Sequence, residues 1–199
     1  MLTAEQKKYR DRANRARRGL LKEKEKFGMI SDGSGKRYQA AVYFVLSGAV
    51  DKAIDFIEWF ESEFPDDVGE PAFFLYATIA YYRAGNIEKA REYLLKTMLS
   101  NIYLLPYLFS KPLPKQDFWH SSNRVQPDYL WEIEEFLDEP KDEEIDWFRE
   151  QFEGEDLTKI RKKYVDTFHA LQHVSEIEKR GQILDEWYEY ESSIHLGKV

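Results

Sequence analysis

The chain has 199 residues, no cysteine and 43% hydrophobic residues. This length suits a single domain and is sufficient to bury a core without disulfides or a structural zinc. The lack of cysteine excludes disulfide scaffolds, thiolate zinc sites, iron–sulfur clusters and cysteine nucleophiles. The basic first 26 residues have no apolar signal region and no run of about 18 apolar residues follows, so we expect a cytoplasmic protein without membrane spans.

The net charge of −8 is distributed unevenly along the chain. Residues 1–26 hold ten Lys and Arg against four Asp and Glu, whereas residues 127–156 hold two against fourteen. A chain polarised in this way can fold one end onto the other, pair with a second copy, or present one end to an oppositely charged partner. The acidic balance of the whole chain disfavours nucleic acid as a partner.

The basic segment 3–26 is predicted to be a helix. Thr3 and Gln6 have the spacing of a capping box, and Gly28 is a stop signal. One narrow face is apolar and consists of Tyr9, Ala13, Ala16 and Leu20. Because this face is small, we expect the position of the helix to depend on salt-sensitive attraction to residues 127–156, in the same chain or in a second copy.

Two segments in the middle of the chain share a pattern of helix, glycine turn and second helix. They span residues 37–65 and 74–102, and "LSGAVDKAIDFIEWF" aligns with "RAGNIEKAREYLLKT" without a gap. The period from Gly48 to Gly85 is 37 residues. The sequence therefore predicts a helical repeat with an insertion within residues 66–70.

These segments resemble the tetratricopeptide repeat (TPR) family, whose period is 34 residues. The shared features are a glycine between the two helices, an alanine five residues later and an aromatic residue four positions before the glycine. They fall at Phe44, Gly48 and Ala53 in the first repeat and at Tyr81, Gly85 and Ala90 in the second. The sequence departs from the family where Arg37 and Phe74 replace its tryptophan and Ile102 replaces its closing proline. The resemblance covers about a third of the chain and implies a TPR-like fold.

The whole chain also resembles a set of bacterial proteins that contain such repeats and have no established activity. The shared stretches are the basic first helix, the links at 31–38 and 63–71, and the segments 97–108 and 119–123. This second resemblance supports the fold and leaves the function open.

Two repeats do not bury their own faces, so the rest of the chain is expected to supply capping helices. Helical periodicity predicts them over residues 142–152, 156–173 and 176–195. The predicted fold is all-α, a TPR-like helical repeat that forms a single helical domain over residues 1–199. Its parts are the basic helix and link at 1–35, two TPR-like repeats at 36–109, a Pro-rich and acidic connection at 110–141, and C-terminal helices at 142–199.

Two stretches could carry chemistry, and each also has a structural interpretation. The Gly-rich residues 31–35 could bind an anion at a helix N-terminus, but a connection between two helices is the interpretation we favour. His169 and His173 have the spacing of zinc ligands, but the end of a helix also favours histidine. We predict no catalytic residue, no cofactor and no metal site.

The leading hypothesis is an interaction protein that acts as a TPR-like scaffold or adaptor for a peptide or protein partner. In the TPR family the first helices of the repeats line a groove, which the resemblance places at Tyr38, Val42, Val45, Leu75, Ile79, Tyr82 and Arg83. The alternative is that the C-terminal helices fill this groove. A second predicted contact is the loop with Trp119, His120, Ser121 and Asn123, which could instead plug the core and cap the next helix.

Two other classes of function are open. An antitoxin- or immunity-type regulator would neutralise a basic partner through residues 128–156. A hydrolase would need a concave pocket that joins His120 or His169 to a carboxylate. The charge distribution is also compatible with a homo-oligomer, whereas nucleic acid and membranes are not expected as partners.

Overall fold

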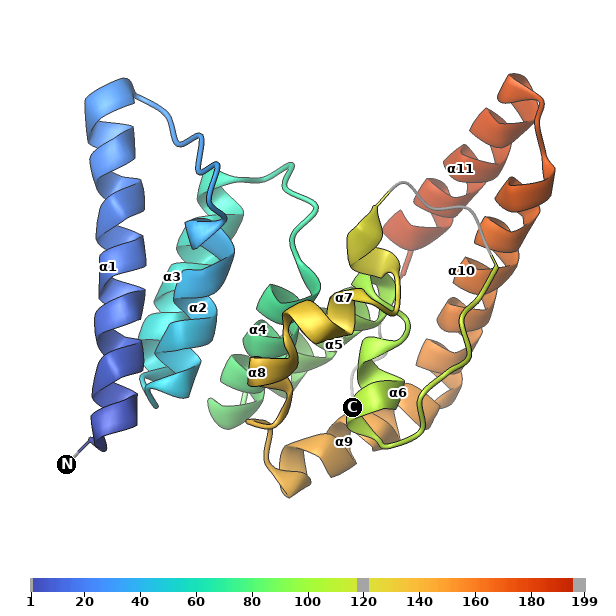
Figure 1. The fold of residues 1–199 in the computed structure, drawn as a ribbon. Helices are drawn as coiled ribbons and strands as arrows, with labels where there is room; N and C mark the ends of the chain where they lie inside the picture. The colour runs from blue at the N-terminus through green and yellow to red at the C-terminus, as the bar shows by residue number, and fades with distance from the viewer. Residues whose placement is uncertain (1, 118–121, 195–199) are drawn as a thin grey trace. The chain divides into compact units, whose positions relative to one another are not determined.

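The structure is a computed structural model that describes residues 2–117 and 122–194 (Figure 1). Every regular element in these two ranges is a helix, so the predicted all-α class is confirmed. Among the described helices, none is both long enough and apolar enough to cross a membrane. The chain divides into two compact units, Met1–Leu94 and Leu95–Val199. The division falls inside a helix of the second predicted repeat.

The first unit is built from helices alone. It contains α1 (Ala4–Phe27), α2 (Lys36–Leu46), α3 (Val50–Glu63), α4 (Pro71–Arg83) and the first part of α5 (Ile87–Ser100). The start and end of α1 are as predicted. The Gln6 N–H donates to Thr3 Oγ1 at 3.1 Å, and the Thr3 N–H donates to Gln6 Oε1 at 3.0 Å. Gly28 ends the helix with φ 73°, a left-handed conformation that favours glycine.

The narrow apolar face of α1 packs along α2, and α1, α2 and α3 run side by side (Figure 1). Ala13 and Leu20 on this face are fully buried. The Tyr9 ring stacks on the Tyr43 ring of α2, with centroids 6.0 Å apart. Alanine lets the two helices approach closely, so a small face makes a tight contact. Packing therefore contributes to holding α1 on α2, where the expectation of a salt-dependent position had counted this burial as weak.

The turns between α2 and α3 and between α4 and α5 have the same hydrogen bonds. In each turn the glycine N–H donates to the carbonyl three residues earlier, and the next N–H donates to the carbonyl five residues earlier. The four distances lie between 2.8 and 2.9 Å, and Gly48 and Gly85 both have φ 76°. This is the Schellman motif, which ends a helix with a left-handed residue. Ala53 and Ala90, five residues after each glycine, are both fully buried.

Helix α4 is buried around its whole circumference. Between Pro71 and Tyr81, Phe74 alone is not buried. The Phe73 ring lies 4.5 Å from Phe60 of α3 and 6.2 Å from Tyr38 of α2, measured between centroids. A helix that is apolar all round is typical of a core position.

The second unit begins within α5 and continues through short helices to three longer ones. Its elements are α6 (Leu104–Leu108), a 3₁₀ helix (Asn123–Val125), α7 (Tyr129–Glu132), α8 (Glu134–Leu137), α9 (Asp142–Glu153), α10 (Glu155–His173) and α11 (Ile177–Ser192). The last three confirm the predicted C-terminal helices. The predicted stripe on α10 is buried and consists of Leu157, Ile160, Tyr164, Phe168 and Leu171. Trp187 of α11 packs edge-on against Tyr164, with centroids 5.3 Å apart.

Arginine side chains cover the carbonyl ends of α9 and α10. Arg161 Nη1 donates to the Phe152 carbonyl at 3.2 Å, and its guanidinium carbon lies 3.8 Å from the centroid of the Phe152 ring. Arg180 Nη1 donates to the Val174 carbonyl at 2.8 Å and to the Leu171 carbonyl. Each arginine sits on the helix that follows the one it caps, so these contacts fix the turns between consecutive helices.

Candidate partner-binding surface

The structure buries most of the predicted groove. Five of its seven residues are buried, namely Tyr38, Val42, Val45, Leu75 and Ile79. Tyr82 and Arg83 are half-buried. A buried side chain contacts no partner unless the fold rearranges, so the expectation of an open groove at these five positions does not match the structure. Their location on α2 and α4 gives them a role in the core.

The predicted loop is only partly visible. Trp119, His120 and Ser121 lie outside the described residues, and Asn123 is exposed at the start of the 3₁₀ helix. The segment that follows is held by Asn101, which is fully buried. Asn101 Nδ2 donates to the carbonyl of Arg124 at 2.7 Å and to that of Gln126 at 3.1 Å.

The role of Asn101 was missed in the sequence. The sequence feature that could have indicated this role is a single amide side chain between the apolar stretches of α5 and α6. Its Oδ1 also accepts the N–H of Tyr103 at 2.9 Å, so both ends of the amide are used. A buried amide that satisfies three backbone groups fixes the loop before α7.

An exposed tryptophan, Trp131, stands on the short helix α7, which is followed directly by α8. The indole of Trp131 is 77% exposed. The same helices are anchored by buried neighbours, which are Tyr129, Leu130, Ile133 and Leu137. The chain thus has enough apolar residues here to fix the two helices and still leaves its largest side chain in solvent. Large exposed aromatics of this kind are enriched in the contacts of protein interfaces.

Seven carboxylates surround Trp131 in the sequence between residues 128 and 142. They are Asp128, Glu132, Glu134, Glu135, Asp138, Glu139 and Asp142, and all are exposed. Within the ranges that the structure describes, none of these carboxylates makes a hydrogen bond or an ion pair. We call Trp131 and these seven carboxylates the Trp131 surface.

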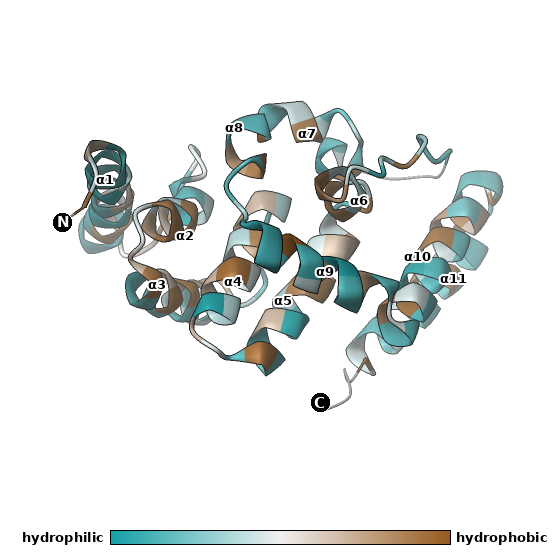
Figure 2. Ribbon diagram, turned by 90° about the horizontal axis from the view of Figure 1, so that it is seen from below, coloured by the Kyte–Doolittle hydropathy of each residue, from teal (hydrophilic) through white to brown (hydrophobic). Residues whose placement is uncertain are grey.

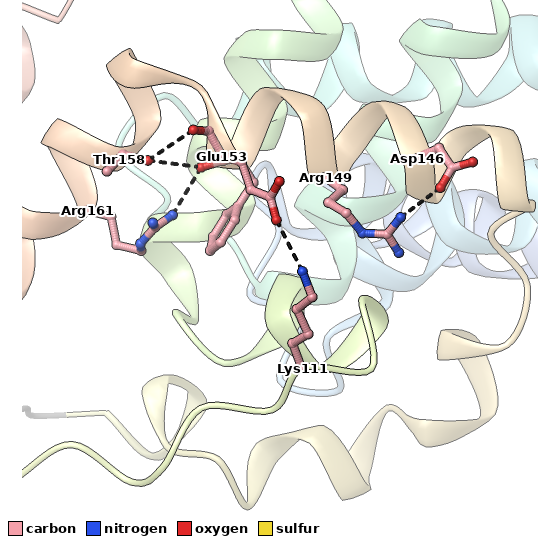
Figure 3. A network of polar contacts seen from close by, with 7 residues as sticks. Lys111, Asp146, Arg149, Glu153, Thr158 and Arg161 are labelled. Atoms are coloured by element: carbon pink, nitrogen blue, oxygen red, sulfur yellow. Dashed lines mark hydrogen bonds and ion pairs between the residues drawn. The ribbon is translucent and has the colours of Figure 1, made fainter.

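The acidic residues of α9 differ, because several of them have partners inside the second unit (Figure 3). Asp146 pairs with Arg149 at 2.8 Å, and Glu153 pairs with Lys111 at 3.4 Å. Glu144 is fully buried and accepts the Lys141 N–H at 2.9 Å. The unpaired acidic surface is therefore concentrated at residues 128–142 and is shorter than the predicted acidic segment.

A tyrosine cluster in the first unit has a structural role. The Tyr93 hydroxyl donates to Glu61 Oε1 at 2.6 Å, and its ring stacks on Tyr81 at 5.4 Å between centroids. Burial, and then the hydrogen bond to Glu61, raise the pKa of Tyr93. Burial also raises the pKa of Tyr81, with a smaller effect from Glu58. Both phenols are therefore neutral in the folded protein at physiological pH.

The Gly-rich residues 31–35 connect α1 to α2, and Asp32 caps the start of α2, which the sequence did not predict. Asp32 accepts the N–H groups of Lys36 and Arg37 at 2.9 and 2.8 Å through its two carboxylate oxygens. These N–H groups belong to the first turn of α2, and they are the donors that an anion bound at this helix N-terminus would need. The protein's own carboxylate therefore occupies that position.

The two predicted histidines lie on α10, where His169 is half-buried and His173 is exposed as the last residue. His120, the other histidine considered for a hydrolase, lies outside the described residues. Among residues 2–117 and 122–194, no three His, Asp or Glu side chains are grouped as metal ligands would be.

Comparisons with known proteins give no relative: no protein-family model, no curated protein and no solved structure matches the chain. The function is therefore inferred from the chemistry of the surfaces.

Proposed function

We propose that this chain is an interaction protein that binds a Lys- and Arg-rich segment of a partner protein at the Trp131 surface. The observation that supports this proposal is the 77% exposed indole of Trp131 among seven exposed, unpaired carboxylates. The buried residues of α7 and α8 hold this surface in place. Binding at the surface requires no catalytic step.

The scaffold of this interaction protein is TPR-like in our proposal. The recurrence of one Schellman turn at Gly48 and Gly85 supports it, as does the burial of Ala53 and Ala90 at the positions where the family has small residues. The partner contact, however, differs from that of the family, because the helix faces that would line a groove are buried. The repeats then act as a support, and the exposed short helices act as the contact.

The chemistry of the Trp131 surface suits a basic partner. The carboxylates attract Lys and Arg side chains over a distance of about a Debye length and steer the encounter. The indole then supplies apolar area and a π face for a cation, which contributes about 0.5–1 kcal/mol at an exposed site. An antitoxin- or immunity-type regulator that neutralises a basic partner is the second candidate, and the same seven carboxylates favour it.

A peptide titration tests this function. A fluorescein-labelled peptide rich in Lys and Arg is titrated with the wild-type chain, with Trp131→Ala and with Tyr188→Ala. Tyr188 is a control because it is an exposed aromatic on α11, outside the Trp131 surface. We expect Trp131→Ala to weaken binding by about tenfold or more, as at an interface hot spot, and Tyr188→Ala to leave it unchanged.

A peptide in which Glu replaces every Lys and Arg controls for charge, and circular dichroism checks that the variants are folded. The function is contradicted if the basic peptide does not bind at low salt, or if Trp131→Ala binds it as tightly as the wild type does.

A further inference from the structure

The outward face of α1 is a second charged surface with no partner. The ribbon of α1 is mostly teal in Figure 2, the colour of hydrophilic residues. Seven basic side chains of this helix are exposed, namely Lys7, Lys8, Arg10, Arg15, Arg17, Arg18 and Lys22. In the part of the chain that the structure describes, none of them makes a hydrogen bond or an ion pair. We call these seven residues the basic face of α1.

We propose that the basic face of α1 docks on the Trp131 surface of a second copy of this chain. The inference rests on the proposed function, because it names a partner for the Trp131 surface. The two surfaces have opposite charge and equal numbers of groups that have no partner among residues 2–117 and 122–194. Charge complementarity of this kind selects which surfaces associate and increases the association rate.

The cations of α1 are arranged as a stripe along the helix. Lys8, Arg15, Arg18 and Lys22 follow one another at spacings of seven, three and four residues, which places them on one side of an α-helix. At a rise of 1.5 Å per residue the stripe is about 21 Å long. Because Ala13 and Leu20 fix the opposite side of α1 on α2, the stripe is held facing solvent. It therefore presents several cations at once to a row of carboxylates.

A second copy fits this stripe better than nucleic acid does. The chain has a net charge of −8, and the seven carboxylates of the Trp131 surface would repel a polyanion. The same carboxylates attract the stripe of another copy. The contact joins two different surfaces, so each copy has one of each to offer, and the assembly is a reciprocal dimer, a closed ring or an open chain.

Sedimentation velocity over a range of protein concentrations tests this contact in the full chain. Measurements at about 0.01 M and about 1 M salt compare Debye lengths of about 30 Å and 3 Å. We expect concentration-dependent association at low salt and a monomer at high salt.

Charge reversal identifies the surfaces. Arg15→Glu with Arg18→Glu makes the α1 variant, and Glu134→Lys with Glu135→Lys makes the acidic-surface variant. Each variant alone should associate far more weakly than the wild type at low salt, because the reversal lowers the magnitude of the altered surface's net charge from seven to three and places two like-charged pairs in the contact. An equimolar mixture should associate again, because the unaltered acidic surface of the α1 variant meets the unaltered basic face of the acidic-surface variant, and the two altered surfaces again carry opposite charges at the exchanged positions. The control variant, Lys52→Glu with Lys159→Glu, changes two exposed, unpaired lysines elsewhere and should associate like the wild type.

The inference is overturned if the wild type is monomeric at low salt at every concentration, or if the control variant dissociates as the α1 variant does. It is also overturned if the mixture stays monomeric. Nucleic acid bound at the α1 surface, detected by its absorbance at 260 nm, would overturn it as well. A monomeric chain that still binds the basic peptide through Trp131 would refute self-association and leave the proposed function standing. If Trp131→Ala binds the peptide with the affinity of the wild type, the proposed function is refuted instead.

Discussion

Replacing Leu20 by alanine should undock α1 from α2. Leu20 is fully buried, whereas the adjacent Leu21 on the same helix is 41% exposed. A buried Leu→Ala change costs about 2.7–5 kcal/mol, because apolar contacts are lost and a cavity remains. An exposed change away from the core stays within about 0.5 kcal/mol. We therefore expect Leu20→Ala to lower the free energy of unfolding by about 3 kcal/mol and Leu21→Ala to leave it nearly unchanged.

Urea unfolding followed by circular dichroism gives this difference, and limited trypsin digestion shows where it acts. The basic face of α1 is rich in trypsin sites, which a docked helix protects. Leu20→Ala should expose them while Leu21→Ala does not. Because apolar packing is not screened by salt, raising the salt concentration should not release α1 in the wild type. Digestion rates are normalised to a small chromogenic substrate to correct for the response of trypsin itself to salt.

Two results would refute the reasoning. The first is an equal loss of stability in Leu20→Ala and Leu21→Ala, which would mean that the packing on α2 contributes little. The second is cleavage of wild-type α1 that accelerates with salt at a protein concentration where the chain is monomeric throughout, which would mean that ion pairs hold the helix as the charge distribution first suggested.

Three further changes test the packing and the titration of the first unit. Gly69→Ala should lower the melting temperature by the equivalent of about 1–3 kcal/mol, because its φ is 71° and a Cβ would lie 2.0 Å from Cζ of Phe74; Gly181→Ala, where a Cβ meets no atom, should not lower it. Ala90→Leu should cost about 1–3 kcal/mol by overpacking a fully buried position, and an unchanged melting temperature would contradict the TPR-like register. Burial raises the pKa of Tyr93, so the unfolded chain loses this proton first and stability should fall as the pH rises above about 10. Urea titrations at pH 8 and above should show this fall in the wild type and a smaller one in Tyr93→Phe.

Local features were predictable because the residues that determine them are close in sequence. The capping box at Thr3, the left-handed Gly28 and the two glycine turns each depend on a few neighbouring residues. The stripe on α10 was predictable for a similar reason, because a regular apolar spacing dictates which side of a helix is buried.

The accessibility of the repeat faces was not predictable from the sequence. The pattern of α2 and α4 shows that Val42 and Leu75 are apolar, but such residues line an open groove as readily as a core. The distinction depends on what packs against α4 from every side, and helical periodicity gives no information about that. Asn101 was missed for the same reason, since two of its three partners are backbone groups more than twenty residues away.

Self-association and partner binding then compete for one surface. If the basic face of α1 from a second copy occupies the Trp131 surface, a basic partner must displace it. The stripe of α1 is held on a rigid helix, whereas a flexible Lys- and Arg-rich segment can place its cations and their aliphatic stems over the indole of Trp131. A basic peptide should consequently convert the assembly to monomers as it binds. The exposed indole would thus distinguish a true partner from another copy, which explains why an aromatic side chain stands among the carboxylates.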